Sequence, residues 1–148
     1  MALIDDVGVG PVALDTAIFI YFIEEDQRYL PLISPLFSRA DEGKLDLMVC
    51  ALTLLEVLVV PYRAGDLELA QRYEALLTRS RGVRMIDITR NHLRLAAQLR
   101  ATTGAATPDA LLLSISLSAR CATFLTNDRR MPAVSGLKIL QLDAYRQR

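Results

Sequence analysis

Four acidic residues, Asp15, Glu56, Asp109 and Asp128, occupy positions from which their carboxylates could be gathered around a cation. Asp15 ends an apolar run at residues 12–15, and Asp128 closely follows another run. Glu56 comes soon after a third run, and Asp109 falls in the expected first turn of a helix. Ligands bind at the carboxyl ends of the strands of parallel sheets. We therefore expect the three acids that follow strands to meet at one sheet edge, and Asp109 to join them if its helix begins there.

The surroundings of these acids favour a divalent cation. Glu56 is the only charged residue between residues 47 and 60, and no lysine or arginine lies near it in the sequence. A carboxylate among apolar groups is costly unless it is paired, hydrogen-bonded or bound to a cation. Carboxylates that gather without basic partners also raise each other's pKa. A site of oxygen ligands suits Mg²⁺ or Mn²⁺, so we predict that all four acids are metal ligands and catalytic residues.

Each acid also has a simple structural interpretation. Asp15 can cap the following helix, and Asp128 can be an ordinary turn residue. Thr53 and Glu56 have the spacing of a capping box, and Asp109 can favour a helix dipole. For each acid alone the structural role is the better interpretation. Only their joint arrangement favours a metal site.

The elements that must position these acids alternate between strand and helix. Strands are expected at residues 12–15, 46–50, 83–86, 121–126 and 137–142. Helices are expected at residues 16–24, 27–42, 54–63, 67–79, 89–102 and 108–119, after an irregular lead at residues 1–11. This alternation predicts a three-layer α/β/α sandwich around a mostly parallel sheet, formed by residues 1–148 as a single domain.

Composition narrows the class of protein. Among 148 residues, 52% are hydrophobic and 23% are charged, which is typical of a globular chain. The 17 basic and 17 acidic residues balance, so nucleic-acid binding would depend on local patches and metal ions. Cys50 and Cys121 are expected to be buried free thiols, and the single histidine, His92, leaves no zinc cluster. We expect a cytoplasmic protein without membrane association, because no export signal or membrane-spanning segment is visible.

Three segments resemble the PIN-domain nucleases, in particular the VapC-type toxins of toxin–antitoxin pairs. They are VALDTAIFI with Asp15, TLLEVLVVPYRAGD with Glu56, and TPDALLLSISLSARCATFLTNDRRM with Asp109 and Asp128. The resemblance extends over residues 12–142. It implies a Mg²⁺- or Mn²⁺-dependent endoribonuclease that hydrolyses RNA phosphodiesters with a metal-activated water. It also implies a small antitoxin partner and a homodimer.

The resemblance assigns roles to individual residues. Asp15 and Asp109 would be the principal metal ligands, and Glu56 and Asp128 would complete the site directly or through water. Small polar residues would position ligands, water or phosphate: Thr16, Thr126 and Asn127. Two neighbouring residues are either phosphate contacts or solvated turn residues: Arg129 and Arg130. The family often has a polar residue at the position of Ala17.

Other functions remain open from the sequence. One is a PIN-fold binding or regulatory module that has lost catalysis, and another is an RNA-processing nuclease that is not a toxin. Core packing rather than base stacking is expected for four aromatic side chains: Tyr21, Phe22, Tyr62 and Tyr73.

Overall fold

The computed structural model describes residues 2–146, in which five strands form one parallel sheet. The strands are β1 (Val12–Leu14), β2 (Leu47–Cys50), β3 (Val83–Ile86), β4 (Thr123–Thr126) and β5 (Lys138–Gln141). They lie in the order β3-β2-β1-β4-β5, and every neighbouring pair is parallel. The mostly parallel sheet that the sequence predicted is confirmed.

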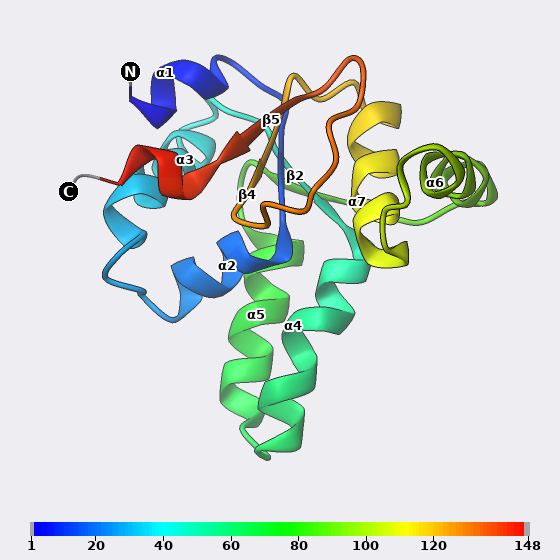
Figure 1. The fold of residues 1–148 in the computed structure, drawn as a ribbon. Helices are drawn as coiled ribbons and strands as arrows, with labels where there is room; N and C mark the ends of the chain where they lie inside the picture. The colour runs from blue at the N-terminus through cyan, green and yellow to red at the C-terminus, as the bar shows by residue number, and fades with distance from the viewer. Residues whose placement is uncertain (1, 147–148) are drawn as a thin grey trace.

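Helices lie on both sides of this sheet (Figure 1). They are α1 (Leu3–Val7), α2 (Thr16–Ile23), α3 (Leu30–Asp41), α4 (Ala51–Arg63), α5 (Leu67–Arg79), α6 (Arg90–Thr103), α7 (Thr107–Ser118) and the 3-10 helix η1 (Leu142–Tyr145). In Figure 1, α6 and α7 lie to the right of the sheet, whereas α1, α2 and α3 lie to its left. The predicted three-layer α/β/α arrangement is therefore confirmed.

Alternation along the strands divides the core between the two faces. Val12 and Leu14 of β1 pack in one buried cluster with Ile18 and Phe19 of α2. Ala13, which lies between them, packs instead in a second cluster with Leu113 of α7. Successive side chains of a strand point to opposite faces, and here both faces are covered. This burial explains why the strands appear in the sequence as continuous apolar runs.

The central strand β1 is the point at which the chain changes direction across the sheet. From β1 the chain proceeds to β2 and β3 on one side, and later to β4 and β5 on the other. The amide of Asp15 donates to the carbonyl of Leu125 (2.9 Å), which extends the pairing of β1 with β4 to the acid itself. In open α/β sheets such a switch point leaves a crevice at the carboxyl ends of the strands. Asp15 therefore lies where a ligand site is expected.

The start of the chain differs from the prediction. Residues 1–11 were expected to be an irregular lead, but Leu3–Val7 form α1, with Leu3 and Val7 buried. The Tyr145 hydroxyl donates to Asp6 Oδ2 (2.6 Å), so α1 is joined to η1 near the other end of the chain. The sequence carries little signal for α1, because this helix has only five residues and no side-chain cap.

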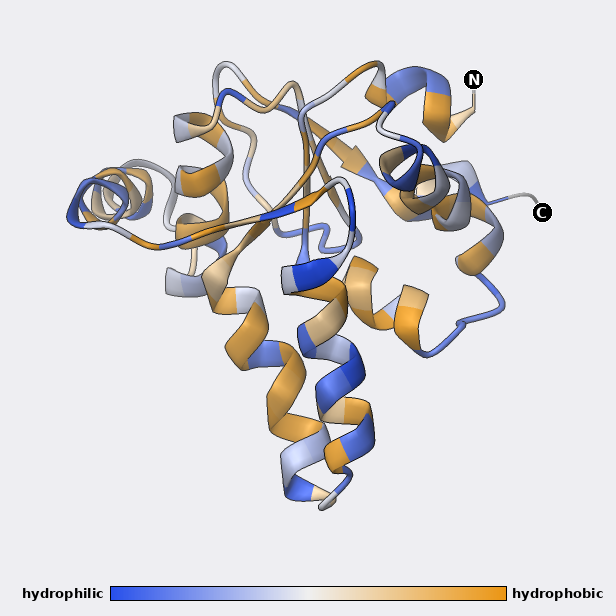
Figure 2. Ribbon diagram, turned by 180° about the vertical axis from the view of Figure 1, so that it is seen from behind, coloured by the Kyte–Doolittle hydropathy of each residue, from blue (hydrophilic) through white to orange (hydrophobic). Residues whose placement is uncertain are grey.

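Helices α4 and α5 form a hairpin that extends away from the sheet (Figures 1 and 2). The hairpin exposes apolar side chains, which we call the hairpin patch: Leu55, Val59, Val60, Tyr62 and Leu67. Core packing was expected for Tyr62, but its side chain is 57% exposed because this end of α4 extends beyond the sheet. Tyr73, by contrast, is buried as predicted.

Two further expectations concern cysteines and membranes. Cys50 and Cys121 are both free and buried, as predicted. Cys121 Sγ lies 3.2 Å from Met48 Sδ across the second core cluster. Within residues 2–146, no helix combines the length and apolar character needed to cross a membrane.

Candidate metal-binding and catalytic site

Asp15 is held by hydrogen bonds to both of its carboxylate oxygens. It is the N-cap of α2, and Oδ1 accepts from the Thr16 amide (2.8 Å). Oδ2 accepts from the Thr126 hydroxyl at the end of β4 (2.5 Å). Burial raises the pKa of Asp15, and the nearby Asp128 adds to this, whereas the bonds from Thr126 and Thr16 oppose it. The capping role is therefore real, and it fixes the carboxylate at the sheet edge.

Thr126 also orients the segment that bears Asp128. The Asp128 amide donates to Thr126 Oγ1 (2.9 Å), so one buried hydroxyl joins the two strand-end acids. Asp128 Oδ1 accepts from the amide (2.9 Å) and the Nε (3.3 Å) of Arg130. These bonds from Arg130 lower the pKa of Asp128. Asp128 is therefore both a turn residue and a carboxylate beside Asp15.

Glu56 is attached to the same edge through α2. The Thr16 hydroxyl donates to Glu56 Oε1 (2.6 Å) and also contacts the Thr53 hydroxyl (2.9 Å). The capping box suggested by Thr53 and Glu56 is wrong. Helix α4 begins at Ala51, so Glu56 lies in the second turn of the helix. The N-cap of α4 is Cys50, which makes no side-chain hydrogen bond. Thr53 and Glu56 instead face Thr16 from one side of α4, because residues three apart lie on the same side of a helix.

Asp109 approaches the other acids from α7. Burial raises its pKa first, followed by the charges of Asp128 and Asp15 and a smaller contribution from Glu56, while Arg130 lowers it. Among residues 2–146 its carboxylate makes no hydrogen bond or ion pair in the structure. Asp109 is thus the acid that the protein itself compensates least.

The loop before α7 determines where Asp109 lies. Arg100 of α6 donates from Nε to the Ala105 carbonyl (3.0 Å) and from Nη1 to Thr107 Oγ1 (2.9 Å). Ala106 is the N-cap of α7, and Thr107 is its first helical residue, one residue before the predicted start. Arg100 therefore holds the start of α7 against α6, a role that the sequence analysis did not identify.

Asn127 and Arg129 have different surroundings. Asn127 Oδ1 accepts from the Asp143 amide of η1 (2.8 Å), and its Nδ2 lies 3.4 Å from the Tyr21 hydroxyl. Asp143 in turn accepts from the Tyr29 hydroxyl (2.7 Å), and Tyr29 stacks on Tyr21 with ring centroids 4.4 Å apart. Asn127 thus anchors the turn before Asp128. Arg129 is exposed, and its side chain makes no hydrogen bond or ion pair within the described part of the chain.

The donor set fits a hard divalent cation in its chemistry. Asp15 and Asp109 have raised pKa values, and no basic side chain forms an ion pair with either in residues 2–146. All candidate ligands are oxygens, as Mg²⁺ and Mn²⁺ prefer. As the side chains are placed, however, no three acid, histidine or cysteine groups of the described residues stand close enough to hold one ion. The acids influence each other electrostatically but do not form a closed ligand shell.

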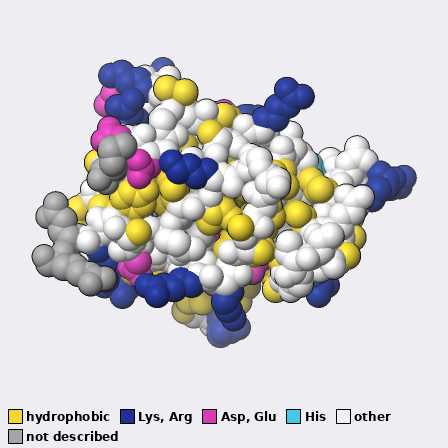
Figure 3. All heavy atoms as spheres, turned by 45° about the horizontal axis from the view of Figure 1, so that its top comes forward, with side chains coloured by type: hydrophobic (Ala, Val, Ile, Leu, Met, Phe, Trp, Pro, Cys, Tyr) yellow, Lys and Arg dark blue, Asp and Glu magenta, His cyan; other side chains and the backbone are white. Residues whose placement is uncertain are grey.

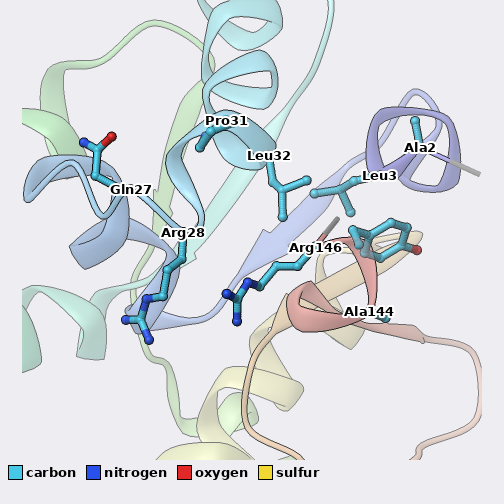
Figure 4. Close-up of a pocket in the computed structure, with 9 residues that line it drawn as sticks. Ala2, Leu3, Gln27, Arg28, Pro31, Leu32, Ala144 and Arg146 are labelled. Atoms are coloured by element: carbon cyan, nitrogen blue, oxygen red, sulfur yellow. The ribbon is translucent and has the colours of Figure 1, made fainter. Parts of the chain in front are cut away.

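Cavity size alone does not select this site. A cavity of about 810 Å³ lies between α1, the start of α3 and η1, and none of the four acids lines it (Figure 4). In it Arg28 and Arg146 point to the same side, with their guanidinium carbons 5.0 and 5.6 Å from the Tyr29 ring centroid. A smaller cavity of about 270 Å³ is lined by Asp109 and Arg130. Chemistry therefore points to the smaller cavity.

On the face drawn in Figure 3, the basic side chains of the described residues do not gather into a patch that could attract nucleic acid. On the face seen in Figure 3, the described Lys and Arg side chains stand mostly around the rim and form no continuous basic surface. This agrees with the net charge of zero. Arg130 is the basic group beside the acids, and its side chain is 89% exposed.

Solved structures of similar fold come from toxin–antitoxin complexes. A chain in a toxin–antitoxin complex from Klebsiella pneumoniae is 19% identical, with a TM-score of 0.65, over 85% of this chain and 94% of that chain. A chain of VapBC2 from Rickettsia felis, bound to a promoter DNA fragment, is 17% identical (TM-score 0.67; 88% and 97% covered). A chain of FitAB bound to an IR36 DNA fragment is 17% identical (TM-score 0.70; 88% and 94% covered). At these identities the likeness shows the fold alone.

The family itself is shown by the sequence. No curated protein matches the chain. The family model described as PIN domain matches residues 12–137, which include the four acids and the whole sheet except β5. The resemblance inferred from the three acid-bearing motifs is confirmed, and the chain belongs to the PIN-domain family.

Proposed function

We propose that this protein is a cytoplasmic, Mg²⁺- or Mn²⁺-dependent endoribonuclease and the toxin of a toxin–antitoxin pair. One observation carries the nuclease proposal: Asp15 and Asp109 are partly buried, both have a raised pKa, and neither has a basic side chain paired with it in the described residues. Such a pair costs free energy unless a cation or protons neutralise it. PIN-domain proteins are typically nucleases, and a cation bound by these two carboxylates would serve metal-dependent hydrolysis.

Asp15 and Asp109 would hold the ion, and Glu56 and Asp128 would complete its surroundings directly or through water. When bound, the ion lowers the pKa of water and offsets the charge of a phosphodiester. The protein's own contribution is orientation: Thr126 and the Thr16 amide fix both oxygens of Asp15. Glu56 has one oxygen bonded to Thr16, which leaves Oε2 to accept a proton or a hydrogen bond from water. Exposed Arg130 lies at the rim, where it can contact a phosphate.

Cleavage of a mixed RNA pool tests the proposal. The protein is assayed with Mg²⁺, with Mn²⁺ and with EDTA, together with Asp109→Asn, which keeps the shape of the side chain and removes its charge. Asp41→Asn is the control, because Asp41 is an exposed acid at the end of α3. We expect chelation and Asp109→Asn, but not Asp41→Asn, to abolish cleavage.

Two other outcomes would contradict the proposal. Cleavage that survives both EDTA and Asp109→Asn would mean that the chosen acids are not the site. Absence of cleavage with every metal and a broad set of RNAs would favour the binding module that has lost catalysis. An RNA-processing role would be favoured if expression of the active protein did not arrest growth.

The hairpin patch supports the proposed partners, a small antitoxin and a second copy of the chain. Several apolar side chains are exposed together there, Val60 by 65% and Leu55 by 62%. Exposed large apolar side chains that gather on one element are a mark of interaction sites. We expect Val60→Glu to disrupt the dimer or antitoxin complex in light scattering, whereas Leu93→Glu, at an isolated exposed leucine on α6, has no effect. If both variants form the same complexes as the wild type, the interface does not include the hairpin patch.

A further inference from the structure

Thr53 is a buried threonine whose hydroxyl leaves its own helix. It is fully buried in α4, and its Oγ1 lies 2.9 Å from Thr16 Oγ1. A threonine within a helix can bond back to a carbonyl one turn earlier. Thr78 and Thr103 do this, with bonds of 2.6 Å to Glu74 and Leu99. Among the described residues, Thr16 is the sole hydrogen-bond partner of the Thr53 hydroxyl.

The direction of the contact follows from counting hydrogens. A threonine hydroxyl has one hydrogen, and an ionised carboxylate can only accept. The Thr16 hydroxyl donates to Glu56 Oε1 (2.6 Å). Its hydrogen is therefore in use, so the hydrogen between the two threonines must come from Thr53. The chain of donors runs from Thr53 to Thr16 to Glu56.

We propose that Thr53 is a positioning residue for Glu56, acting through Thr16. The inference rests on the proposed metal-dependent function. Hydrogen bonds in such a chain polarise and strengthen one another inside a protein. The Thr53 bond fixes the rotamer of the Thr16 hydroxyl, which in turn holds Oε1 of Glu56. Oε2 makes no hydrogen bond in the described residues, and Glu56 lies near enough to contribute to the raised pKa of Asp109.

The same chain links Glu56 to Asp15. The Thr16 amide donates to Asp15 Oδ1 (2.8 Å), and the Thr16 hydroxyl donates to Glu56 Oε1. Thr16 thus sets the relative position of two proposed ligands, and Thr53 sets that of Thr16. Residues that hydrogen-bond to metal ligands without binding the metal themselves typically lower the metal affinity about 10- to 100-fold when they are removed. We therefore expect Thr53→Val to weaken Mn²⁺ binding about 10-fold.

The test measures Mn²⁺ binding by calorimetry in the absence of RNA, and the crystal structure of each variant. Thr53→Val preserves shape and removes the hydroxyl, and Thr53→Ser should restore wild-type affinity. Thr123→Val is the matched control, because Thr123 is also buried but its hydroxyl has no partner in the described structure. We expect weaker binding and a displaced Glu56 side chain only in Thr53→Val.

The outcomes separate this inference from the proposed function. If Thr53→Val lowers thermal stability but binds Mn²⁺ as the wild type does, Thr53 is merely structural and the inference is wrong. If the wild type binds no Mn²⁺, the proposed function fails, and the variant's crystal structure then decides. A displaced Glu56 would still support positioning by Thr53, and an unmoved Glu56 would refute it.

Discussion

Replacing Thr126 with valine tests the hydroxyl that joins the two strand-end acids. The side chain is fully buried, and its Oγ1 donates to Asp15 Oδ2 (2.5 Å) and accepts from the Asp128 amide (2.9 Å). Valine has nearly the same shape, so the substitution removes both bonds without opening a cavity. A hydrogen bond to a charged group contributes about 1.5–3 kcal/mol, and a neutral one about 1 kcal/mol. We expect Thr126→Val to lower the free energy of unfolding by about 2.5–4 kcal/mol.

The control lies on the same strand. Thr123 is buried, and its hydroxyl has no hydrogen-bond partner in the described part of the structure. Thr123→Val makes the same chemical change and should alter the free energy of unfolding by less than about 0.5 kcal/mol, or increase it. The assay is urea unfolding followed by far-ultraviolet circular dichroism, because the chain has no tryptophan. EDTA is present so that bound cations do not contribute.

The pH dependence gives an additional check. The Thr126 bond lowers the pKa of Asp15 against the effect of burial. Removing it raises that pKa further, because the ionised carboxylate loses a donor. The destabilisation by Thr126→Val should therefore be largest near neutral pH and shrink as the pH falls through the range in which Asp15 takes up a proton. Equal effects of Thr126→Val and Thr123→Val at neutral pH would refute the reasoning.

Two further substitutions affect stability in opposite directions. The pKa of Asp109 is raised in the folded protein. The contribution of Asp109 to the free energy of unfolding is therefore fully present below the pKa of aspartate in the unfolded chain, about 3.9, and is lost as the pH rises through the folded-state pKa. Asp109→Asn should therefore raise the melting temperature at pH 7 in EDTA but not at pH 3, and a lower melting temperature at pH 7 would contradict this. Gly82 has φ +79°, and a Cβ there would lie 2.3 Å from the Ala40 carbonyl oxygen. Gly82→Ala should cost on the order of 3 kcal/mol in urea unfolding, whereas Gly65→Ala, with φ +69° and open space around it, should cost only about 1–2 kcal/mol; equal costs would show that the contact with Ala40 relaxes.

The sheet could be predicted because its strands have a strong local signal. Residues 83–86 were expected as a strand and form β3, and α5 begins and ends at Leu67 and Arg79 as predicted. Helix starts without a side-chain cap were harder to place. The start of α4 at Ala51 was missed because its N-cap Cys50 makes no side-chain bond. The three-residue error placed Glu56 in the first turn instead of the second and gave Thr53 the position of a cap.

The site was predictable only where an acid follows a strand. Asp15 lies at the expected edge because β1 and β4 are adjacent, and the amide of Asp15 continues their pairing. The approach of Asp109 depends on how α7 packs on α6 and on the contact of Arg100 with Thr107. The Thr16–Thr53 contact joins residues 37 positions apart. Such tertiary contacts have no local pattern, although the three-residue spacing of Thr53 and Glu56 was visible.

The sheet order has a consequence for synthesis of the chain. The central strand β1 pairs with β2 on one side. On its other side it pairs with β4, which lies more than a hundred residues later in the chain. Until the ribosome has delivered residues 107–128, Asp15 lacks both Thr126 and Asp109. Pairing of such distant segments is slow to form. A nascent chain therefore cannot bring the four acids together until residues 123–128 have emerged and β4 has paired with β1.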